Sequence, residues 1–290
     1  MESLRRSRKI VQAVKGRALS LERRALRVSA GISARLRRDQ RRVSVAIPTF
    51  ERRDPAAACL DRLIADDRVA EIVVRDDASH EAVYAVLCER LPQRSPKLRL
   101  ARNSSNVGPL ANKWRTIRDC TSDWVILLDA DNSFDRSYLD LLFGIRPWDH
   151  NVIYCPDFAR PHFDFTRWGG ETIDLARAKT MLAGDSQRFA TTFFNTGNFF
   201  VKREQYLRRV QVFLDSVREV PDVLVANYAW MRDGGTLRVV KGLTYDHLVR
   251  SDGFHASNRD RCQAAARVIR ECIARDAALP DSLRSPQRQR

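Results

Sequence analysis

From Val43 onward, short apolar and β-branched runs alternate with segments of helical periodicity, and this alternation restricts the fold more than any other feature of the chain. Strands that alternate with helices form parallel sheets, because each helix carries the chain back to the starting end of the next strand. The sequence therefore predicts an α/β fold with a mainly parallel sheet flanked by helices. The strands expected in the first half are Val43–Ile47, Glu71–Val74, Leu98–Ala101 and Trp124–Leu128.

Helices are expected between these strands at Pro55–Ala65, at Glu81–Arg90 and after Pro109. Asp54 is expected to cap the first of them, with Pro55 at its first helical position. The second half of the chain is less regular. Its expected strands are Asn151–Cys155, Phe193–Val201 and Leu237–Val240, and its expected helices are Ile173–Leu182, Arg203–Val217, Val223–Arg232 and Asn258–Ala277.

Polar residues gather where each of the first four strands ends. In open parallel sheets, ligands bind beyond the carboxyl ends of the strands, so four polar clusters at four such ends predict one site. The residues in these clusters are Thr49 and Glu51, Asp76 and Asp77, Asn103 and Asn106, and Asp129 and Asp131.

Asp129 and Asp131 carry the strongest chemical signal in this set. Two carboxylates one residue apart at the end of a buried strand can hold a hard divalent cation, Mg²⁺ or Mn²⁺, together with phosphate oxygens. An isolated pair of this kind is more often a solvated turn. Here Leu127 and Leu128 drive the pair to the edge of the core, and the neighbouring carboxylates would repel one another without a cation or hydrogen-bond donors.

The net charge of +15 is concentrated at the two ends of the chain. Residues 1–42 carry +11 and residues 259–290 carry +4, which leaves residues 43–258 neutral. A neutral body with basic ends indicates that the charge belongs to appendages and says little about the site in the body.

The first 42 residues are expected to form a basic amphipathic helix. Such a helix could lie on an anionic membrane surface, pair with another helix or pack on its own domain, and nucleic-acid binding is the least favoured alternative. The apolar stripe consists of Val11, Val14, Ala18, Leu21, Ala25, Val28 and Ile32.

No apolar stretch approaches the roughly 18–20 residues that span a bilayer, and the amino terminus does not resemble a secretory signal. We therefore expect a cytoplasmic protein, with peripheral contact to the inner membrane face as an option. The six cysteines show no zinc-ligand spacing and are expected to be reduced thiols with mainly structural roles.

The order of these motifs resembles glycosyltransferase family 2, whose members have the GT-A fold with a Rossmann-like nucleotide-binding half. The resemblance covers about residues 43–250 and continues past the first four strands. The matching segments are Val45–Arg52, Val73–Ser79, Asn106–Gly108, Trp124–Asp131, Asn195–Arg203, Asp222 and Tyr245–His247.

The resemblance implies inverting transfer of a sugar from a nucleotide-diphosphate sugar, expected to be UDP-linked, to a hydroxyl of a glycan or lipid-linked acceptor. Asp222 would then be the general base, although a helix cap is its alternative role. Mn²⁺ or Mg²⁺ would be held by Asp129, Asp131 and His247, with an ordinary loop histidine as the alternative for His247. The nucleotide-sugar would contact Pro48, Thr49, Glu51, Asp77, Asn106, Lys113 and Asp129.

Two positions depart from the family pattern. Ala78 stands where the family usually has glycine, and Pro221 precedes Asp222 where another acidic residue is common. Phe163, Phe165 and Trp168 flank a Gly-Gly loop, where they could stack on a sugar, although packing on the core is the favoured interpretation.

The expected organisation is a basic helical extension (1–42), a GT-A domain (43–250) and a C-terminal helix with a basic tail (251–290). The domain divides into a nucleotide-binding half (43–135) and an acceptor half (136–250).

Two other functions remain open. A sugar-phosphate nucleotidyltransferase would share the fold class, but the first strand lacks the Gly-rich loop that cradles a triphosphate. A non-catalytic module that binds membranes or nucleic acid through the basic ends would show salt-sensitive affinity and no metal-dependent chemistry.

Overall fold

The computed structural model describes residues 42–183, 187–214, 222–248 and 259–275. The chain divides into residues 1–41 and a compact unit comprising residues 42–290. The predicted basic helix over residues 1–42 therefore lies outside the described residues, except for Arg42, and so does the predicted tail.

The described residues form a nine-stranded sheet with the order β3-β2-β1-β4-β8-β5-β9-β7, and β6 pairs with β5 outside this path. β1 to β4 are parallel to one another, β8 is antiparallel to both of its neighbours, and β9 is parallel to β5. The predicted α/β fold is confirmed. The strands are β1 (Val43–Thr49), β2 (Val69–Asp76), β3 (Leu98–Arg102), β4 (Trp124–Leu127), β5 (Val152–Arg160), β6 (Phe163–Asp164), β7 (Thr172–Ile173), β8 (Phe199–Lys202) and β9 (Thr236–Asp246).

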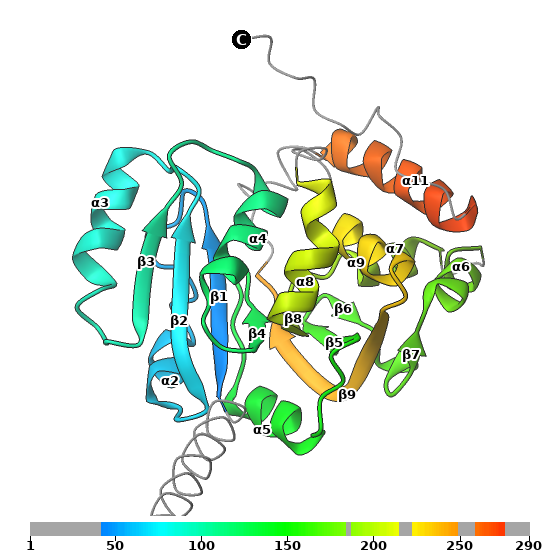
Figure 1. The fold of residues 1–290 in the computed structure, drawn as a ribbon, viewed down its shortest axis with the longest axis horizontal. Helices are drawn as coiled ribbons and strands as arrows, with labels where there is room; N and C mark the ends of the chain where they lie inside the picture. The colour runs from blue at the N-terminus through cyan, green and yellow to red at the C-terminus, as the bar shows by residue number, and fades with distance from the viewer. Residues whose placement is uncertain (1–41, 184–186, 215–221, 249–258, 276–290) are drawn as a thin grey trace, which may run out of the picture. The chain divides into compact units, whose positions relative to one another are not determined.

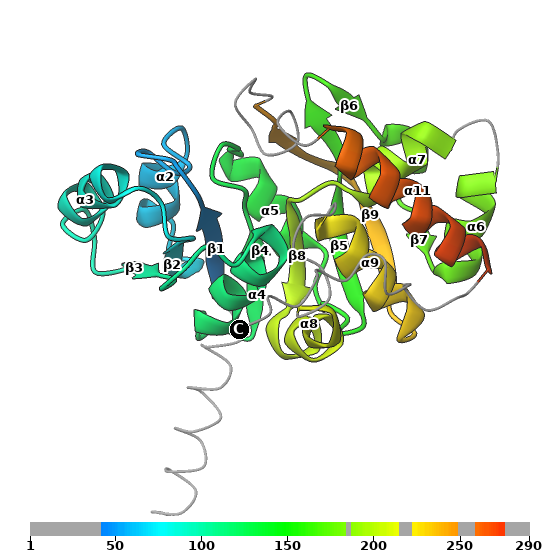
Figure 2. The same ribbon diagram turned by 90° about the horizontal axis from the view of Figure 1, so that it is seen from above.

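Helices cover both faces of this sheet (Figures 1 and 2). One apolar core includes residues of α4, α8, α9 and α11, and a second includes residues of α2, α3 and α5. The helices are α2 (Leu60–Ala65), α3 (Glu81–Arg90), α4 (Pro109–Asp119), α5 (Arg136–Gly144), α6 (Leu175–Ala183), α7 (Gln187–Phe194), α8 (Arg203–Val210), α9 (Asp222–Arg232) and α11 (Arg259–Arg275).

The strand order puts the switch point of the parallel sheet between β1 and β4. From β1 the chain moves outward to β2 and β3, then returns to place β4 on the other side of β1. β1 and β4 are buried along their whole length, as expected for mainly apolar strands covered on both faces. The loops that follow β1, β2 and β4 meet at one edge, where ligands bind in open sheets of this kind (Figure 1).

The first helix starts later than predicted. Asp54 does not cap it, because residues 55–59 form turns and α2 begins only at Leu60. Ala56 has a φ of 52°, which is incompatible with a right-handed helix, and its N–H donates to the carbonyl of Ala130 at 2.7 Å. A contact with the loop after β4 therefore outweighs the local signals for a helix start.

The predicted strand Phe193–Val201 is wrong in its first half. Phe193 and Phe194 end helix α7, and the strand β8 begins only at Phe199. The Phe193 ring packs edge-on against Phe165 at 5.2 Å, so these phenylalanines serve a helix–core contact. A short apolar run is compatible with either element, and tertiary packing decides between them.

Two further sequence predictions concern single side chains. Phe165 and Trp168 are buried in the core, which confirms the favoured interpretation for these two members of the aromatic cluster, whereas Phe163 is only half-buried. The five cysteines with described side chains are free thiols, and all but Cys88 are buried.

Among the described residues, no helix is long and apolar enough to cross a membrane.

Candidate active site

Asp129 follows the buried strand β4 and is held by its neighbours on two sides. Its backbone N–H donates to Asn198 Oδ1 at 2.9 Å. Gly197 lies against its carboxylate so closely that a Cβ on Gly197 would stand 2.2 Å from Asp129 Oδ2. The short turn before β8 therefore needs glycine at position 197, because any side chain there would displace the Asp129 carboxylate.

Lys113 of α4 connects Asp129 with Asp222. Its Nζ lies 2.9 Å from Asp129 Oδ1 and 2.7 Å from Asp222 Oδ2. Burial alone lowers the pKa of the Lys113 ammonium, but the charges of Asp129 and Asp222 outweigh burial and raise that pKa above its ordinary value. The ammonium therefore stays charged, and three elements far apart in sequence meet at one ion-pair cluster.

Asp222 is the first residue of α9, and its side chain is 15% exposed. At this end of a helix, the unpaired backbone N–H groups favour a negative charge. Asp222 therefore places a carboxylate with partial access to solvent at a helix start, as a general base requires.

Asp131 lies two residues beyond Asp129, and its side chain is 28% exposed. Burial is the main cause that raises the pKa of its carboxyl, and the negative charge of Asp129 adds to it. Arg52, in the loop after β1, approaches Asp131 Oδ2 to 3.4 Å. Asp129 and Asp131 thus bring two negative charges together in a partly desolvated site.

His247 follows the last residue of β9 and comes close to the Asp131 segment through backbone pairing. Asp246 pairs with Ser133, and the N–H of Leu248 donates to Asn132 Oδ1 at 3.2 Å. The His247 ring lies 5.4 Å from the ring of half-buried Phe163. The strand order therefore brings a histidine from the end of the domain to the loop after β4.

The donor types at Asp129 and Asp131 fit a hard divalent cation, since both residues offer carboxylate oxygens. Burial and repulsion from Asp129 raise the pKa of Asp131, and a bound cation would offset both effects. Within the described part of the chain, no group of three or more His, Cys, Asp or Glu side chains is arranged to hold a metal ion. His247 as a third ligand stays a prediction.

Asp77, at the end of β2, uses its carboxylate to hold the loop that leads into α4. It accepts hydrogen bonds from Asn103 Nδ2 at 2.8 Å and from the backbone N–H groups of Val107 and Gly108, both at 3.0 Å. Burial raises the pKa of Asp77, and these hydrogen bonds oppose the rise. Asn106 accepts a bond from the N–H of Gly108 at 3.2 Å and so acts as a turn former in this loop.

Glu51 connects the loop after β1 to the start of α3, because its Oε1 accepts the N–H of His80 at 2.6 Å. Ala78 has a φ of 56°, so this alanine adopts the conformation for which the family usually has glycine. Pro48 and Thr49 are the last two residues of β1, and both are buried. The Thr49 hydroxyl makes no hydrogen bond within the described part of the chain, which leaves it available to a ligand.

The predicted site residues thus fall into two groups at the same edge of the sheet. Lys113, Asp129 and Asp222 are in direct contact, and Asp131 and His247 lie on adjoining segments. The other group consists of Pro48, Thr49, Glu51, Asp77 and Asn106 in and after β1 to β3.

Sequence reasoning missed two site residues, namely Arg52 and Gly197. Both stand inside the motif segments Val45–Arg52 and Asn195–Arg203, so the signal was present. Their contacts with Asp129 and Asp131 depend on how distant segments meet, which the local pattern does not reveal.

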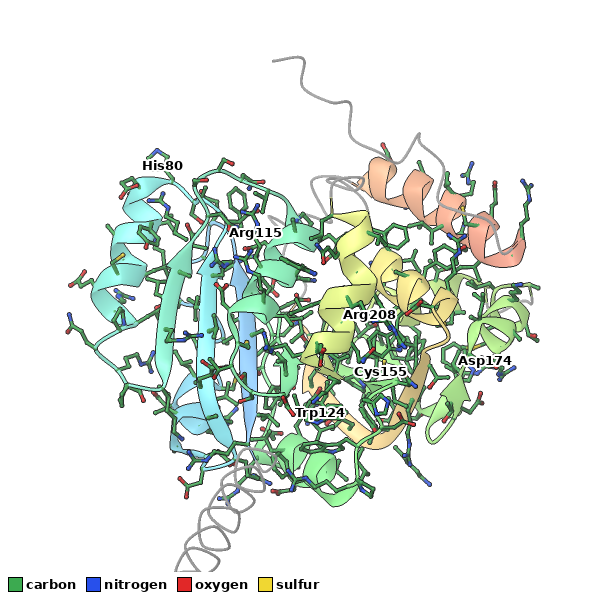
Figure 3. All side chains as sticks on the ribbon, in the orientation of Figure 1. His80, Arg115, Trp124, Cys155, Asp174 and Arg208 are labelled. Carbon is green, nitrogen blue, oxygen red and sulfur yellow. The ribbon has the colours of Figure 1, made fainter. Side chains whose placement is uncertain are left out.

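Side chains surround the whole sheet in Figure 3, where His80 and Arg115 mark the end with the carboxyl termini of the parallel strands. Trp124, the first residue of β4, marks the opposite end. Glu51, Asp77, Asn106, Asp129, Asp131 and His247 follow the carboxyl ends of their strands, so they belong to the His80 side. Lys113 joins Asp222 to Asp129 there.

Comparison with known proteins gives a match to the family model described as glycosyl transferase family 2 over residues 44–210, more than half of the chain. A sequence search of curated proteins gives no match.

Solved structures with a similar fold include S. aureus TarS 1–349 in complex with UDP, with a TM-score of 0.55 at 14% identity, covering 83% of this chain and 68% of that one. A second is the mannosyltransferase PcManGT from Pyrobaculum calidifontis in complex with GDP-Man and Mn²⁺, with a TM-score of 0.54 at 19% identity, covering 84% and 67%. A third is GalNAc-T7 with UDP, GalNAc and Mn²⁺, with a TM-score of 0.51 at 16% identity, covering 73% and 44%. These likenesses show the GT-A type of fold.

Proposed function

The chain belongs to glycosyltransferase family 2, and from this premise we propose that it is an inverting, metal-assisted enzyme. Its donor is a nucleotide-diphosphate sugar of the UDP class, and its acceptor is a hydroxyl of a glycan or lipid-linked molecule. Such a reaction belongs to polysaccharide biosynthesis in the cytoplasm. Family membership favours this chemistry over nucleotidyl transfer and over a purely binding role.

The observation that supports this proposal best is the meeting of Asp222 and Asp129 on the Lys113 ammonium at the switch point of the sheet. In a single in-line displacement, a carboxylate removes the proton from the attacking hydroxyl while the donor bond breaks. Asp222, a partly exposed carboxylate at the start of α9, has the chemistry for that role. Asp129 belongs to the donor side of the same cluster.

The remaining residues are assigned to donor binding. Asp129 and Asp131 would hold a divalent cation, with His247 as a further ligand, and the cation would neutralise charge on the departing diphosphate. Lys113 would contact the diphosphate as a fixed positive charge. Pro48, Thr49, Glu51, Asp77 and Asn106 would form the nucleoside side of the site, with the Thr49 hydroxyl free to bond to it.

The structural neighbours support the donor class without deciding the nucleotide. TarS and GalNAc-T7 are described with UDP, whereas PcManGT is described with GDP-Man. Mn²⁺ accompanies the nucleotide in the last two. Both nucleotide classes therefore belong in the first assay.

The test is a screen of UDP- and GDP-sugars for release of the nucleoside diphosphate, with Mn²⁺, with Mg²⁺ and with a chelator, alongside thermal shifts with UDP and GDP. We expect turnover and stabilisation with a UDP-sugar that depend on the metal. Inversion is then read from the anomeric configuration of the product by NMR. Metal-independent turnover, or retention of configuration, would contradict the corresponding part of the proposal.

Asp222→Asn is the matched variant for the chemical step. Loss of a general base costs about 10²–10⁴-fold in rate, whereas loss of a helix cap costs about 1 kcal/mol of stability. We expect the variant to bind UDP and metal normally in calorimetry and to transfer poorly. Unchanged turnover with a lower melting temperature would make Asp222 a helix cap.

A further inference from the structure

Lys113 has a geometry that donor binding alone does not explain. Its side chain is only 10% exposed, and its ammonium contacts Asp129 on one side and Asp222 on the other. A lysine ammonium has three N–H donors. Its contacts with these two carboxylates are ion pairs, and an ammonium held in this way can still donate an N–H to a further acceptor.

The backbone around Lys113 is anchored on both sides. Asn112 donates from Nδ2 to the carbonyls of Thr49 and Arg75, at 3.4 and 3.3 Å, which fixes α4 to β1 and β2. Trp114 donates from Nε1 to the carbonyl of Leu207 at 3.0 Å, which fixes α4 to α8. Lys113 therefore projects from a rigid support, as groups that must place another side chain require.

The Asp222 carboxylate contacts the Lys113 ammonium of the neighbouring helix α4. Asp222 is the first residue of α9, and Lys113 is its ion-pair partner among the described residues. The direction of its carboxylate thus depends on the Lys113 contact at 2.7 Å.

We propose that Lys113 is a positioning residue for Asp222 through their ion pair, and that its ammonium also donates a hydrogen bond to an oxygen of the donor diphosphate. One ammonium then touches the leaving group, the donor-side carboxylate and the base, so placement of the base is coupled to occupancy of the donor site. This inference rests on the proposed function, because it assigns a second role within that same site.

Positioning and donor binding predict different kinetics. A residue that only binds donor raises KM, and saturating donor restores kcat. A residue that also places the base lowers kcat even when the donor is saturating. Its effect on kcat must largely disappear when Asp222 no longer acts as a base, because effects of residues that act as a unit are not additive.

The experiment is a double-mutant cycle of Lys113→Met and Asp222→Asn, with the nucleotide-sugar that turns over in the screen and water or a simple glycoside as acceptor. We expect Lys113→Met to weaken UDP binding in calorimetry about tenfold, since charge-assisted hydrogen bonds are strong. We expect it to lower kcat at saturating donor by at least about tenfold, and by less than about threefold in the Asp222→Asn background. Lys113→Arg keeps the charge and should recover part of kcat.

Lys202→Met is the matched control. It removes a lysine that pairs with Asp123 at 2.7 Å, at the opposite end of the sheet from the site. Its kcat and UDP affinity should equal those of the wild type, and circular dichroism checks that each variant is folded. If Lys113→Met does not fold, the same cycle is run with Lys113→Arg, and the expected loss of kcat is smaller.

Two results would overturn the inference. One is a kcat at saturating donor that equals the wild-type value in Lys113→Met, or in Lys113→Arg if only that variant folds. The other is an additive loss of kcat in the double variant. Failure of the proposed function is distinguishable, because the wild-type protein would then turn over no nucleotide-sugar.

Discussion

The close contact between Gly197 and Asp129 shows how a residue without a side chain can fix the place of a carboxylate. A Cβ at position 197 would stand 2.2 Å from Asp129 Oδ2, a distance that real contacts do not reach. The carboxylate would have to leave its place beside Lys113. The site therefore depends on a glycine that contributes no chemistry of its own.

Gly197→Ala should lower UDP affinity and turnover at least about tenfold, and overpacking should cost about 1–3 kcal/mol of stability. Calorimetry with UDP and chemical denaturation measure the two effects. Gly144→Ala in α5 is the control, because a Cβ at position 144 would have no described atom within 4 Å and alanine is the better helix former. Wild-type UDP affinity in Gly197→Ala would show that the contact does not matter.

Asp131, which we propose as a cation ligand, works against stability. Its folded pKa is raised by burial and by Asp129, so the ionised form is disfavoured in the folded protein. The contribution of such an acid to folding stability falls as pH rises from the ordinary aspartate value, about 3.9, through its raised folded pKa. At neutral pH the full penalty is present.

Asp131→Asn should therefore melt at the same or a higher temperature than the wild type at pH 7, without nucleotide or metal. This advantage should shrink as the pH is lowered through the ordinary range for aspartate. Transfer should be abolished, and calorimetry should show that Mn²⁺ no longer strengthens UDP binding. A variant that binds and turns over like the wild type would remove Asp131 from the site.

At the scale of elements, α8 and α9 are joined to the base of the sheet by Arg209. Its side chain is 4% exposed, lies over the Trp230 ring at 4.2 Å, and donates to Asp233 and to Asn151. Gly235 belongs to the same contact, because a Cβ there would collide with both Arg209 and Trp230. This junction fixes the helix that begins with Asp222.

Arg209→Ala should cost about 2 kcal/mol or more of unfolding free energy, since it removes charge-assisted hydrogen bonds and a desolvated cation–π contact. Arg208→Ala is the control. Arg208 pairs with the same Asp233 at 2.9 Å but is 57% exposed, and its position on α8 is labelled in Figure 3. Exposed pairs contribute about 0–1 kcal/mol, so equal losses in urea denaturation would contradict this assignment.

For the whole molecule, the distribution of charge separates the basic ends from the catalytic body. Residues 1–42 carry +11, whereas residues 43–258 are neutral. The first strand begins directly after this segment, at Val43, and ends at the site with Thr49. We infer that residues 1–42 tether or assemble the enzyme and take no part in its chemistry.

Deletion of residues 1–42 should leave UDP affinity and donor hydrolysis unchanged. It should reduce sedimentation with anionic vesicles, in a way that salt screens, or change the oligomeric mass in light scattering if the segment pairs with itself. Loss of UDP binding by a folded, truncated protein would place the segment in the site.

Much of the fold follows from local sequence alone. The mainly apolar runs of β1 and β4 and Gly108 followed by Pro109 at the start of α4 act within a few residues. Because parallel strands end at one edge, their order also predicts that the polar residues after them share a site. Local pattern is sufficient where a residue needs only its neighbours in sequence.

The remaining features depend on segments that meet only in the folded chain. Ala130 captures the Ala56 N–H and delays α2, and the Phe193 ring completes a core contact that makes its segment helical. The Lys113 bridge between Asp129 and Asp222 arises because β4 lies beside β1, while α9 packs against α4. Such pairings are set by long-range packing, whose free energy belongs to the assembled core, so no local periodicity encodes them.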